Sequence, residues 1–502
     1  MKKAAFLSLG CKVNSYETNG LIRLFEADGY TIVPFSDTAD VYVVNTCTVT
    51  NMADHKSRQM LHRAKKKNPE AVIAAVGCYV EAYAEEIDKD ISVDVYTGNQ
   101  EKSRILSMVN ELLGKKLLKD KDVKPEDDGT EKKNGAETEA ENENGKTETL
   151  KIQNEKKKNM SLQDKGAELK ERYKSGRSDF EELPIDRAGE RTRAVIKIQD
   201  GCNQFCSYCV IPYARGKVRS RRFEDILDEV NRLVGNGYKE IVLTGIHLSS
   251  YGIDQPEQER KTLMDVLEAV DVIPGLERVR LGSLEPRLIT EENVKRMAGL
   301  KKLCPHFHLS LQSGCKTVLE RMNRHYTPEE YYEGVLRLRD AFQSPAITTD
   351  VIVGFPQETE EEWKETLDFV RKVSFSSMHI FKYSKREGTI ACEMKHQVPE
   401  QEKTYRAGIL AEVEEELRTA YENQWIGKEE NVLFEEKVSV GEDVYWVGHT
   451  ARYVKIGVKD EGQSFENREC EVSVLGRNQE FLYGVLRKKP ERSRNEKSLA
   501  IS

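Results

Sequence analysis

The sequence of 502 residues has no run of apolar residues near the roughly 18 that a membrane-spanning helix requires. The short apolar run behind Met1-Lys2-Lys3 is about seven residues long and leads into polar, helix-forming sequence, so it indicates a first β-strand rather than a signal peptide. An excess of positive charge is also lacking, because the net charge is −8. Contact with nucleic acid must therefore come from local basic patches. We expect a soluble, cytoplasmic protein that does not contact a membrane.

Cysteine is scarce as well. Ten cysteines in a chain of this length are too few and too unevenly spaced for a scaffold of disulfide bonds. Six of them stand in two groups, which fits a reducing compartment and metal ligation. The other four have no spacing that indicates a site, and we interpret them as buried or incidental: Cys304, Cys315, Cys392 and Cys470.

Aromatic residues are missing from residues 119–159, where Lys, Glu, Asp, Asn, Gly and Thr dominate. Such a composition cannot bury enough apolar surface to offset the conformational entropy of the chain. We predict that residues 115–185 form a disordered linker or insertion. The alternative is a segment that binds a partner through its charges.

The first cysteine group lies within residues 199–222 and has the spacing Cys-x3-Cys-x2-Cys, formed by Cys202, Cys206 and Cys209. Thiolates are the soft ligands of zinc and of iron–sulfur clusters. A closed zinc site needs a fourth ligand, and the next histidine along the chain is His247. A four-iron cluster on three cysteines leaves one iron open, as radical S-adenosylmethionine (SAM) enzymes require. The stretch resembles their signature, so we predict a [4Fe–4S] cluster, with zinc as the alternative.

The second group is scattered through the first 80 residues. Apolar runs at 4–10, 40–45 and 71–77 alternate with helical sequence, which predicts a parallel sheet. A cysteine follows each run: Cys11, Cys47 and Cys78. Parallel strands share one carboxyl edge, where α/β sheets bind ligands, so these cysteines should meet at a second cluster. The alternative is three ordinary buried cysteines.

The remaining pattern predicts an α/β multidomain protein. The first helix is expected to begin at Asn14 as its cap, with Glu17 as the capping partner. Strand–helix alternation returns at residue 193 and predicts a partial (β/α)6 barrel rather than the full eight-stranded form. Its six strands are expected at 194–198, 240–244, 278–282, 307–311, 348–353 and 378–383. Residues 424–487 read as about five short alternating strands, which predicts a small β-barrel.

Several motifs together resemble the methylthiotransferase family of radical-SAM enzymes, and the resemblance covers nearly all of the chain outside 115–185. Besides the Cys202 triplet they are residues 9–18 (LGCKVNSYET), 44–47 (VNTC), 76–78 (VGC), 282–286 (GSLEP), 308–314 (HLSLQSG) and 353–356 (VGFP). The resemblance implies an N-terminal methylthiotransferase domain at 1–114, the linker at 115–185, a radical-SAM core at 188–418, an RNA-binding TRAM β-barrel at 421–487 and a basic tail at 488–502.

The residues after the first cysteine are most similar to the branch that acts on N6-threonylcarbamoyladenosine (t6A), next to the anticodon of tRNA. The implied reaction adds a methylthio group to adenine C2, using two [4Fe–4S] clusters and SAM. One cluster, on Cys202, Cys206 and Cys209, generates a 5′-deoxyadenosyl radical from SAM. The other, on Cys11, Cys47 and Cys78, supplies the sulfur. The hard chemistry then belongs to the cofactors, while the protein orients them and excludes water. The implied partners are the anticodon loop of tRNA and an electron donor such as flavodoxin or ferredoxin.

Strand ends of the barrel supply candidate contacts to SAM, namely Thr244, Gly245, Glu285 and Gln312, although each also reads as an ordinary strand-end turn or cap. A basic run beside the cysteine loop predicts either a phosphate-binding patch or a solvated start of a helix; it comprises Arg215, Lys217, Arg219, Arg221 and Arg222. Tyr453 and Phe481 are candidate platforms for base stacking.

Three alternatives to the t6A reaction stay open. The first two are the same chemistry on isopentenyladenosine in tRNA and on a ribosomal protein. The third is a zinc-stabilised RNA-binding protein without catalysis.

Overall fold

The structure is a computed structural model, and it describes residues 2–119, 173, 179–187 and 192–487. Most of the expected linker and the basic tail at 488–502 lie outside these residues. Where the ends of the linker are described, they differ from expectation. Helix α5 (Ile105–Lys119) runs across the expected boundary at 115, while Leu183 and Ile185 are fully buried. Part of the segment just before the barrel is therefore packed into the fold.

The N-terminal sheet is parallel throughout, with the strand order β2-β1-β3-β4-β5. Its strands are β1 (Lys3–Ser8), β2 (Thr31–Val33), β3 (Val41–Thr46), β4 (Val72–Gly77) and β5 (Val95–Thr97). The helices between them are α1 (Lys12–Ala27), α2 (Asn51–Lys67), α3 (Cys78–Ala82) and α4 (Ala84–Lys89). The parallel sheet is confirmed. Strands β2 and β5 were not expected, because three residues are too few to show a periodic pattern.

The central part contains the six expected strands, but hydrogen bonding divides them into two sheets. One sheet holds β6 (Arg193–Asp200), β8 (Glu240–Gly245) and β9 (Arg278–Leu281), with the antiparallel β7 (Arg219–Ser220) at its edge. The other holds β10 (His306–His308), β11 (Ala346–Val353) and β12 (Ser377–Lys382). Isolated bridges join Val279 to Leu303 and Leu284 to Leu309 across the gap. No pairing between β6 and β12 occurs among the described strands, so the barrel stays open.

Helices follow the strands of these sheets, and α8 (Phe223–Gly235), α9 (Leu263–Asp271) and α15 (Glu400–Asn423) pack directly against the strands. The others are α7 (Ile211–Arg215), α10 (Glu291–Ala298), α11 (Lys316–Arg321), α12 (Pro328–Ala341), α13 (Glu360–Val373) and α14 (Ile390–Glu393). Strand β11 shows which side faces inward. Thr349 and Val351 are buried on the helix side, whereas the alternate residues Thr348 and Asp350 are half-buried on the inner side of the open barrel.

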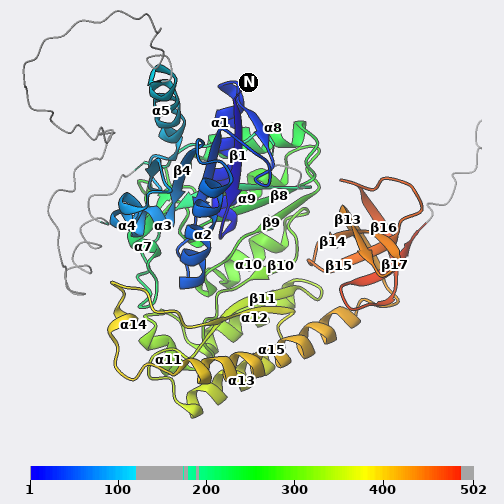
Figure 1. The fold of residues 1–502 in the computed structure, drawn as a ribbon. Coiled ribbons are helices and arrows are strands. Elements are labelled where there is room, and N and C mark those ends of the chain that lie inside the picture. Colours follow the sequence, from blue (N-terminus) through cyan, green and yellow to red (C-terminus); the bar gives the residue numbers. More distant parts are fainter. Residues whose placement is uncertain (1, 120–172, 174–178, 188–191, 488–502) are drawn as a thin grey trace, which may run out of the picture.

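Helix α15 leads from the open barrel to a small C-terminal barrel (Figure 1). That barrel is closed in the order β13-β14-β15-β17-β16 and has its own core around Phe434 and Trp446. Its strands are β13 (Glu429–Val440), β14 (Asp443–Thr450), β15 (Lys455–Lys459), β16 (Glu469–Arg477) and β17 (Leu482–Leu486). The expected five-stranded β-barrel is confirmed.

One continuous core fixes the N-terminal sheet against the open barrel. Tyr16 and Phe25 of α1 are fully buried in the same cluster as Ile196 and Ile198 of β6. Each fully buried side chain of this size is worth about 1.5–3 kcal/mol, so α1 holds the two parts in a defined orientation. Among the described residues, no helix is long and apolar enough to span a membrane.

Candidate functional site

The structure brings Cys11, Cys47 and Cys78 together at the carboxyl edge of the N-terminal sheet. Cys11 caps the start of α1, Cys47 follows β3, and Cys78 is the first residue of α3. Gly10 has φ +92°, and a Cβ atom there would lie 2.5 Å from the Sγ of Cys47, so only glycine lets the two loops approach. Burial, together with the nearby Cys78 and Cys11, raises the pKa of Cys47 to about 12. The predicted convergence of these cysteines is therefore present.

Asn14 and Glu17 do not cap the first helix, so that prediction was wrong. The helix begins at Lys12 with Cys11 as its cap, three residues before the expected cap. Instead, Asn14 Nδ2 donates to the carbonyls of Leu9 (2.8 Å) and Thr46 (2.9 Å), which ties the Cys11 loop to the Cys47 loop. Both side chains are buried, and a buried polar group needs partners that only the tertiary structure supplies.

The second trio lies in the loop after β6. Burial raises the pKa of Cys202 to about 12, and the nearby Cys206 contributes. Burial, Cys206 and Cys202 raise the pKa of Cys209 as well. The backbone N–H of Cys209 donates to the carbonyl of Cys206 at 2.9 Å, so the loop turns tightly at the carboxyl end of the strand. A guanidinium nitrogen of Arg324 lies 3.2 Å from the Sγ of Cys206, where its positive charge favours a thiolate.

Arg215, at the end of α7, connects the two trios. Its Nε lies 3.3 Å from the Sγ of Cys78, and a terminal nitrogen donates to Asn14 Oδ1 at 2.7 Å. Cys209 precedes Arg215 by only six residues, which span at most about 20 Å when extended and less in a helix. The two groups of thiols are therefore linked through one short helix, because Cys209 precedes its first residue and Arg215 at its last residue contacts Cys78.

The connection is made within a buried group of charges. Arg215 donates to Glu17 at 2.9 Å and to Asp200 at 3.1 Å, and Lys197 contacts the same two carboxylates. Burial alone would raise the pKa of Glu17, but Arg215, Lys102 and Lys197 outweigh it and lower the pKa well below its ordinary value. Both carboxylates are therefore charged in the interior, and each is paired with several cations.

The prediction of a phosphate-binding patch is wrong for three of its five residues. Arg215, Arg219 and Arg221 are at most 2% exposed and are paired with carboxylates inside the protein. The alternative, a solvated start of a helix, is wrong for these three residues for the same reason. Only Lys217 and Arg222 are exposed. A run of cations in the sequence says nothing about which of them point inward.

All four candidate SAM contacts lie at carboxyl ends of barrel strands, on the side of the cysteine loop. Thr244 and Gly245 end β8, Glu285 follows β9, and Gln312 follows β10 with φ +69°. Glu285 accepts a hydrogen bond from Arg324 at 2.7 Å. Because Arg324 also contacts Cys206, Glu285 is linked to the cysteine loop. The role of these residues in binding SAM stays a prediction.

The inner face of the open barrel holds a polar group that was not predicted. His308 Nε2 lies 3.2 Å from Asp350 Oδ2, and His308 Nδ1 lies 3.0 Å from Thr348 Oγ1. One ligand atom of each of His308, Asp350 and His379 lies within 4.8 Å of the other two. The alternation of polar and apolar residues along β11 was the signal that could have revealed an inward-facing Asp350.

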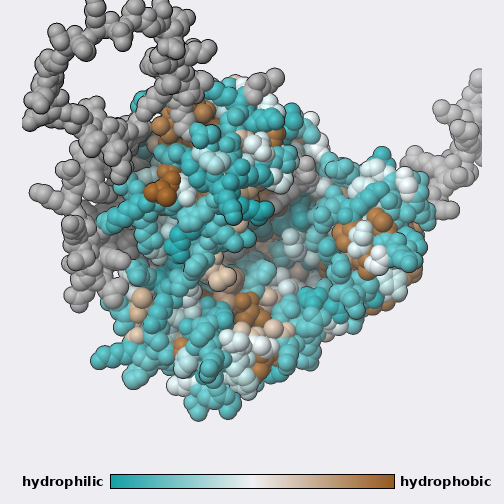
Figure 2. All heavy atoms as spheres, in the orientation of Figure 1, coloured by the Kyte–Doolittle hydropathy of each residue, from teal (hydrophilic) through white to brown (hydrophobic). Residues whose placement is uncertain are grey.

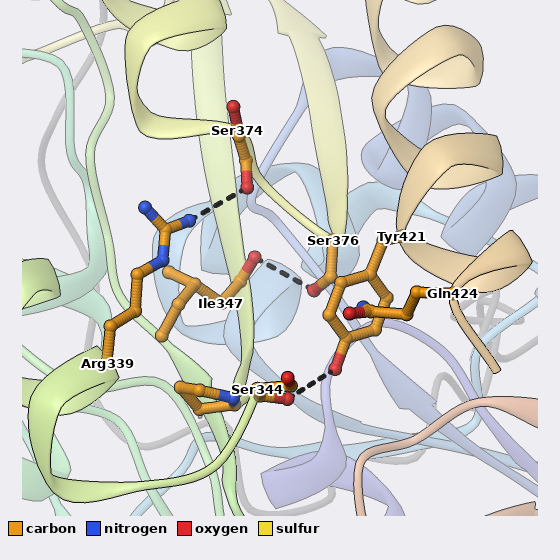
Figure 3. Close-up of a pocket in the computed structure, with 8 residues that line it drawn as sticks. Arg339, Ser344, Ile347, Ser374, Ser376, Tyr421 and Gln424 are labelled. Carbon is orange, nitrogen blue, oxygen red and sulfur yellow. Dashed lines mark hydrogen bonds between the residues drawn. The ribbon is translucent and has the colours of Figure 1, made fainter. Parts of the chain in front are cut away.

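One cavity near the end of the open barrel is not part of this site. It measures about 360 Å³ and lies where β11 and β12 begin, at the opposite end from the cysteines (Figure 3). Its polar walls satisfy one another: Arg339 donates to the Ser374 carbonyl at 3.0 Å and Tyr421 to the Ser344 carbonyl at 3.0 Å. The candidate stacking platforms also differ from expectation. Phe481 is buried in the C-terminal barrel, and the ring of Tyr453 stacks on His306 and His449.

Comparison with known proteins places the chain. Residues 196–370 match the Radical SAM superfamily, and residues 3–98 match the Uncharacterized protein family UPF0004. The Threonylcarbamoyladenosine tRNA methylthiotransferase MtaB of Bacillus subtilis (strain 168) is 37% identical over 460 residues, which cover 91% of this chain and 91% of that protein. The chain belongs to the radical-SAM methylthiotransferase family. The predicted family membership is thus confirmed.

Other relatives in the methylthiotransferase family are nearly as similar. The protein of the same name in Aquifex aeolicus (strain VF5) is 38% identical, covering 86% of this chain and 92% of its own length. The tRNA-2-methylthio-N(6)-dimethylallyladenosine synthase of Clostridium botulinum (strain Loch Maree / Type A3) is 35% identical, with 85% and 84% covered.

A solved structure shares the fold at low identity. The radical S-adenosylmethionine methyltransferase TsrM from Kitasatospora setae superposes with a TM-score of 0.51 at 13% identity, covering 78% of this chain and 77% of that chain. The match supports the expected α/β multidomain fold, which the sheets described above confirm.

Proposed function

We propose that this methylthiotransferase acts on tRNA and replaces the hydrogen on C2 of t6A, next to the anticodon, with a methylthio group. The t6A-specific names of the Bacillus and Aquifex relatives support this substrate. The residues after the first cysteine, Cys11-Lys12-Val13-Asn14, support the same branch. One SAM would supply the methyl group, and a second would take up the hydrogen as 5′-deoxyadenosine.

The observation that carries the proposal is the pair of cysteine trios connected through α7 and Arg215. Tetrahedral zinc with bonds of about 2.3 Å would hold its thiolates less than about 4 Å apart. Among the described residues, only one group of three such ligand side chains lies within 4.8 Å of one another, and it contains no cysteine. The wider spacing of both trios suits a cluster of several irons better than a single ion. With their neighbouring arginines, Cys11, Cys47 and Cys78 and Cys202, Cys206 and Cys209 fit two [4Fe–4S] clusters.

When bound, the clusters would supply the electron that cleaves SAM and the sulfur that is transferred. The protein's own residues hold SAM and the cysteine loops in position. Glu285, Thr244, Gly245 and Gln312 would orient SAM at the carboxyl ends of the barrel strands. Arg215 fixes the Cys78 loop relative to the segment that carries Cys209, which would keep the two cluster sites at a constant separation.

The remaining assignments follow the same proposal. The C-terminal barrel would be the TRAM domain that holds RNA, with the boundaries expected from the sequence. A flavodoxin or ferredoxin would supply electrons, and the reaction would take place in the cytoplasm, where tRNA is processed.

Mass spectrometry of tRNA nucleosides from cells with and without the gene tests the substrate. We expect 2-methylthio-t6A to be replaced by t6A when the gene is absent. Unchanged 2-methylthio-t6A would overturn the proposal, and loss of 2-methylthio-isopentenyladenosine instead would identify the other tRNA substrate. Loss of a methylthio group from a ribosomal protein alone would identify the ribosomal protein as the substrate. A colourless protein that contains zinc and does not cleave SAM under dithionite would show that the chain binds RNA without catalysis.

A further inference from the structure

Apolar packing fixes the N-terminal sheet to the β6 side of the open barrel, where α1 contacts β6. Strand β12 forms the other free edge and pairs, among the described strands, with β11 alone. The face of the molecule in Figure 2 is mostly hydrophilic, and its apolar residues form small separate patches. A connection on the β12 side is therefore expected to be polar. The chain that follows β12 is residues 383–391, here called the bridging segment.

Arg386 of the bridging segment contacts the loop of Cys47. The side chain of Arg386 is 2% exposed. Its guanidinium group donates to Thr48 Oγ1, to Asn51 Oδ1 at 2.8 Å and to Asp54 Oδ2 at 2.7 Å. Thr48 directly follows Cys47, and the hydroxyl of Thr48 donates to Asp54 Oδ1 at 2.8 Å. Arg386 therefore holds the chain next to one proposed cluster ligand.

The same guanidinium group reaches a second element that carries a cysteine. Its carbon lies 5.8 Å from the ring centre of Tyr83, within the range of a cation–π contact. Tyr83 directly follows α3, and Cys78 is the first residue of that helix. Arg386 thus contacts two of the three segments that carry the N-terminal trio. Because the guanidinium group is planar and rigid, it fixes these two segments relative to one another.

The other end of the bridging segment contacts the radical-SAM signature loop. The backbone N–H of Ala391 donates to the carbonyl of Ser207 at 2.8 Å, and Ser207 lies inside the Cys-x3-Cys-x2-Cys sequence. The segment itself is held in shape, because Thr389 Oγ1 donates to the carbonyl of Arg386 at 2.6 Å. The two cysteine trios are therefore joined by a second short stretch of chain, separate from α7.

We propose that Arg386 is a positioning residue for the transfer of sulfur, because it holds the loop of Cys47 in place relative to the signature loop. The inference rests on the proposed function. The radical that removes the hydrogen and the sulfur that replaces it must reach the same carbon of the base, and a displacement of about 1 Å can lower a rate about 100-fold. All three acceptors of the Arg386 guanidinium group belong to the N-terminal part. Loss of this group should therefore impair sulfur transfer and spare the cleavage of SAM.

The test measures two products in one assay. Anaerobic, cluster-loaded enzyme is mixed with SAM, dithionite and an anticodon stem–loop that contains t6A, and mass spectrometry quantifies 5′-deoxyadenosine and 2-methylthio-t6A. In Arg386→Gln we expect 5′-deoxyadenosine to form within about twofold of the wild-type rate, while the 2-methylthio-t6A formed per 5′-deoxyadenosine falls at least about tenfold. Lys385→Gln removes a charge from an exposed position of the same segment and should keep the wild-type ratio.

A purely structural role of Arg386 gives a different result. Both products would then fall together with the iron content, and this outcome would overturn the inference, as would an unchanged ratio. Asp54→Asn keeps the shape of the partner and removes its charge, so it should lower the ratio as well. This variant tests the same contact if Arg386→Gln does not fold. Because both changes act on one contact, their effects on the ratio should not add in the double variant.

A second measurement separates this inference from the proposed function. Hydrogen exchange of the backbone amides at residues 47–54, measured on cluster-loaded protein without RNA, should be at least about tenfold faster in Arg386→Gln and unchanged in α1. Wild-type enzyme that forms no 2-methylthio-t6A on the stem–loop would refute the proposed function, and faster exchange would still support anchoring of the Cys47 loop by Arg386. Unchanged exchange at residues 47–54 would refute the role of Arg386 even when the wild-type enzyme forms the product.

Discussion

The Nε of Arg215 lies 3.3 Å from the Sγ of Cys78, although 137 residues separate them in the chain. The contact joins the loop of the radical-SAM signature to the loop of a distant cysteine. Around it, Glu17, Asp200 and Lys197 form a buried network of charges without exposed members. The relative position of the two cysteine trios thus depends on buried ion pairs as well as on the apolar core.

Removal of Arg215 should therefore be costly. In Arg215→Gln the carboxylates of Glu17 and Asp200 lose one of the two cations that they share, and breaking a buried pair costs about 3–5 kcal/mol. We expect the free energy of unfolding to fall by this amount, as measured by denaturant titration. Arg222→Gln is the matched control, because the side chain of Arg222 is 78% exposed, and its effect should stay within about 0.5 kcal/mol. Equal stability of the two variants would show that the network does not hold the fold.

Each trio of cysteines should hold its own share of the iron in the protein. Anaerobically purified wild-type protein should contain about eight iron atoms per chain, in two [4Fe–4S] clusters. Replacing Cys202, Cys206 and Cys209 together by alanine should leave about four, measured by iron analysis and visible absorption. Cys392→Ser, which changes a half-buried cysteine outside both trios, should keep all eight. A triple variant with its full iron content would remove the signature cysteines as ligands.

Glu285 should influence SAM and not iron. Its carboxylate is 6% exposed and is held by Arg324 at 2.7 Å, so it presents a fixed acceptor at the end of β9. Glu285→Gln should raise the Kd for SAM about tenfold, which corresponds to about 1.4 kcal/mol. Anaerobic calorimetry measures the Kd, and iron analysis confirms that the cluster is present. Glu291→Gln, an exposed change on α10, should bind SAM as the wild type does. Unchanged SAM affinity in Glu285→Gln would exclude this contact.

Glu362 should make the stability of the folded protein depend on pH in the acidic range. Burial would raise the pKa of this carboxyl, but hydrogen bonds from Arg321 and Thr317 and from the backbone of Thr359 lower it to about 2. Because the pKa in the folded protein lies below the ordinary 4.5, the stabilisation is complete above about pH 4.5 and is lost as the pH falls towards 2. Water screens the pair, so we expect about 1 kcal/mol.

Glu362→Gln should accordingly lower the midpoint of thermal unfolding at pH 7, and the difference from the wild type should shrink as the pH is lowered from 5 to 3. Glu291→Gln, on the solvent side of α10, is the matched control and should show no such pH-dependent difference. A difference between Glu362→Gln and the wild type that stays constant over this pH range would contradict the assignment.

Much of the fold could be predicted from the sequence because its signals are local. Apolar runs that end at Cys11, Cys47 and Cys78 give both the strands and the edge where the thiols meet, since parallel strands align their carboxyl ends. The prediction that Asn14 caps the first helix was wrong, and the reason is also physical. A short polar side chain near a helix start is a cap only if no better partner is near, and the carbonyls of Leu9 and Thr46 are better partners.

The sequence by itself determined the alternation of strands and helices, the two sets of thiols and the family, because each of these is written in local spacing and in short motifs. Only the tertiary structure decided that Arg215, Arg219 and Arg221 are buried, that Arg324 links Glu285 to Cys206, and that Arg386 contacts Thr48 beside Cys47. The physical reason is that burial and ion pairing arise between residues far apart in the chain, whose proximity depends on how whole sheets pack.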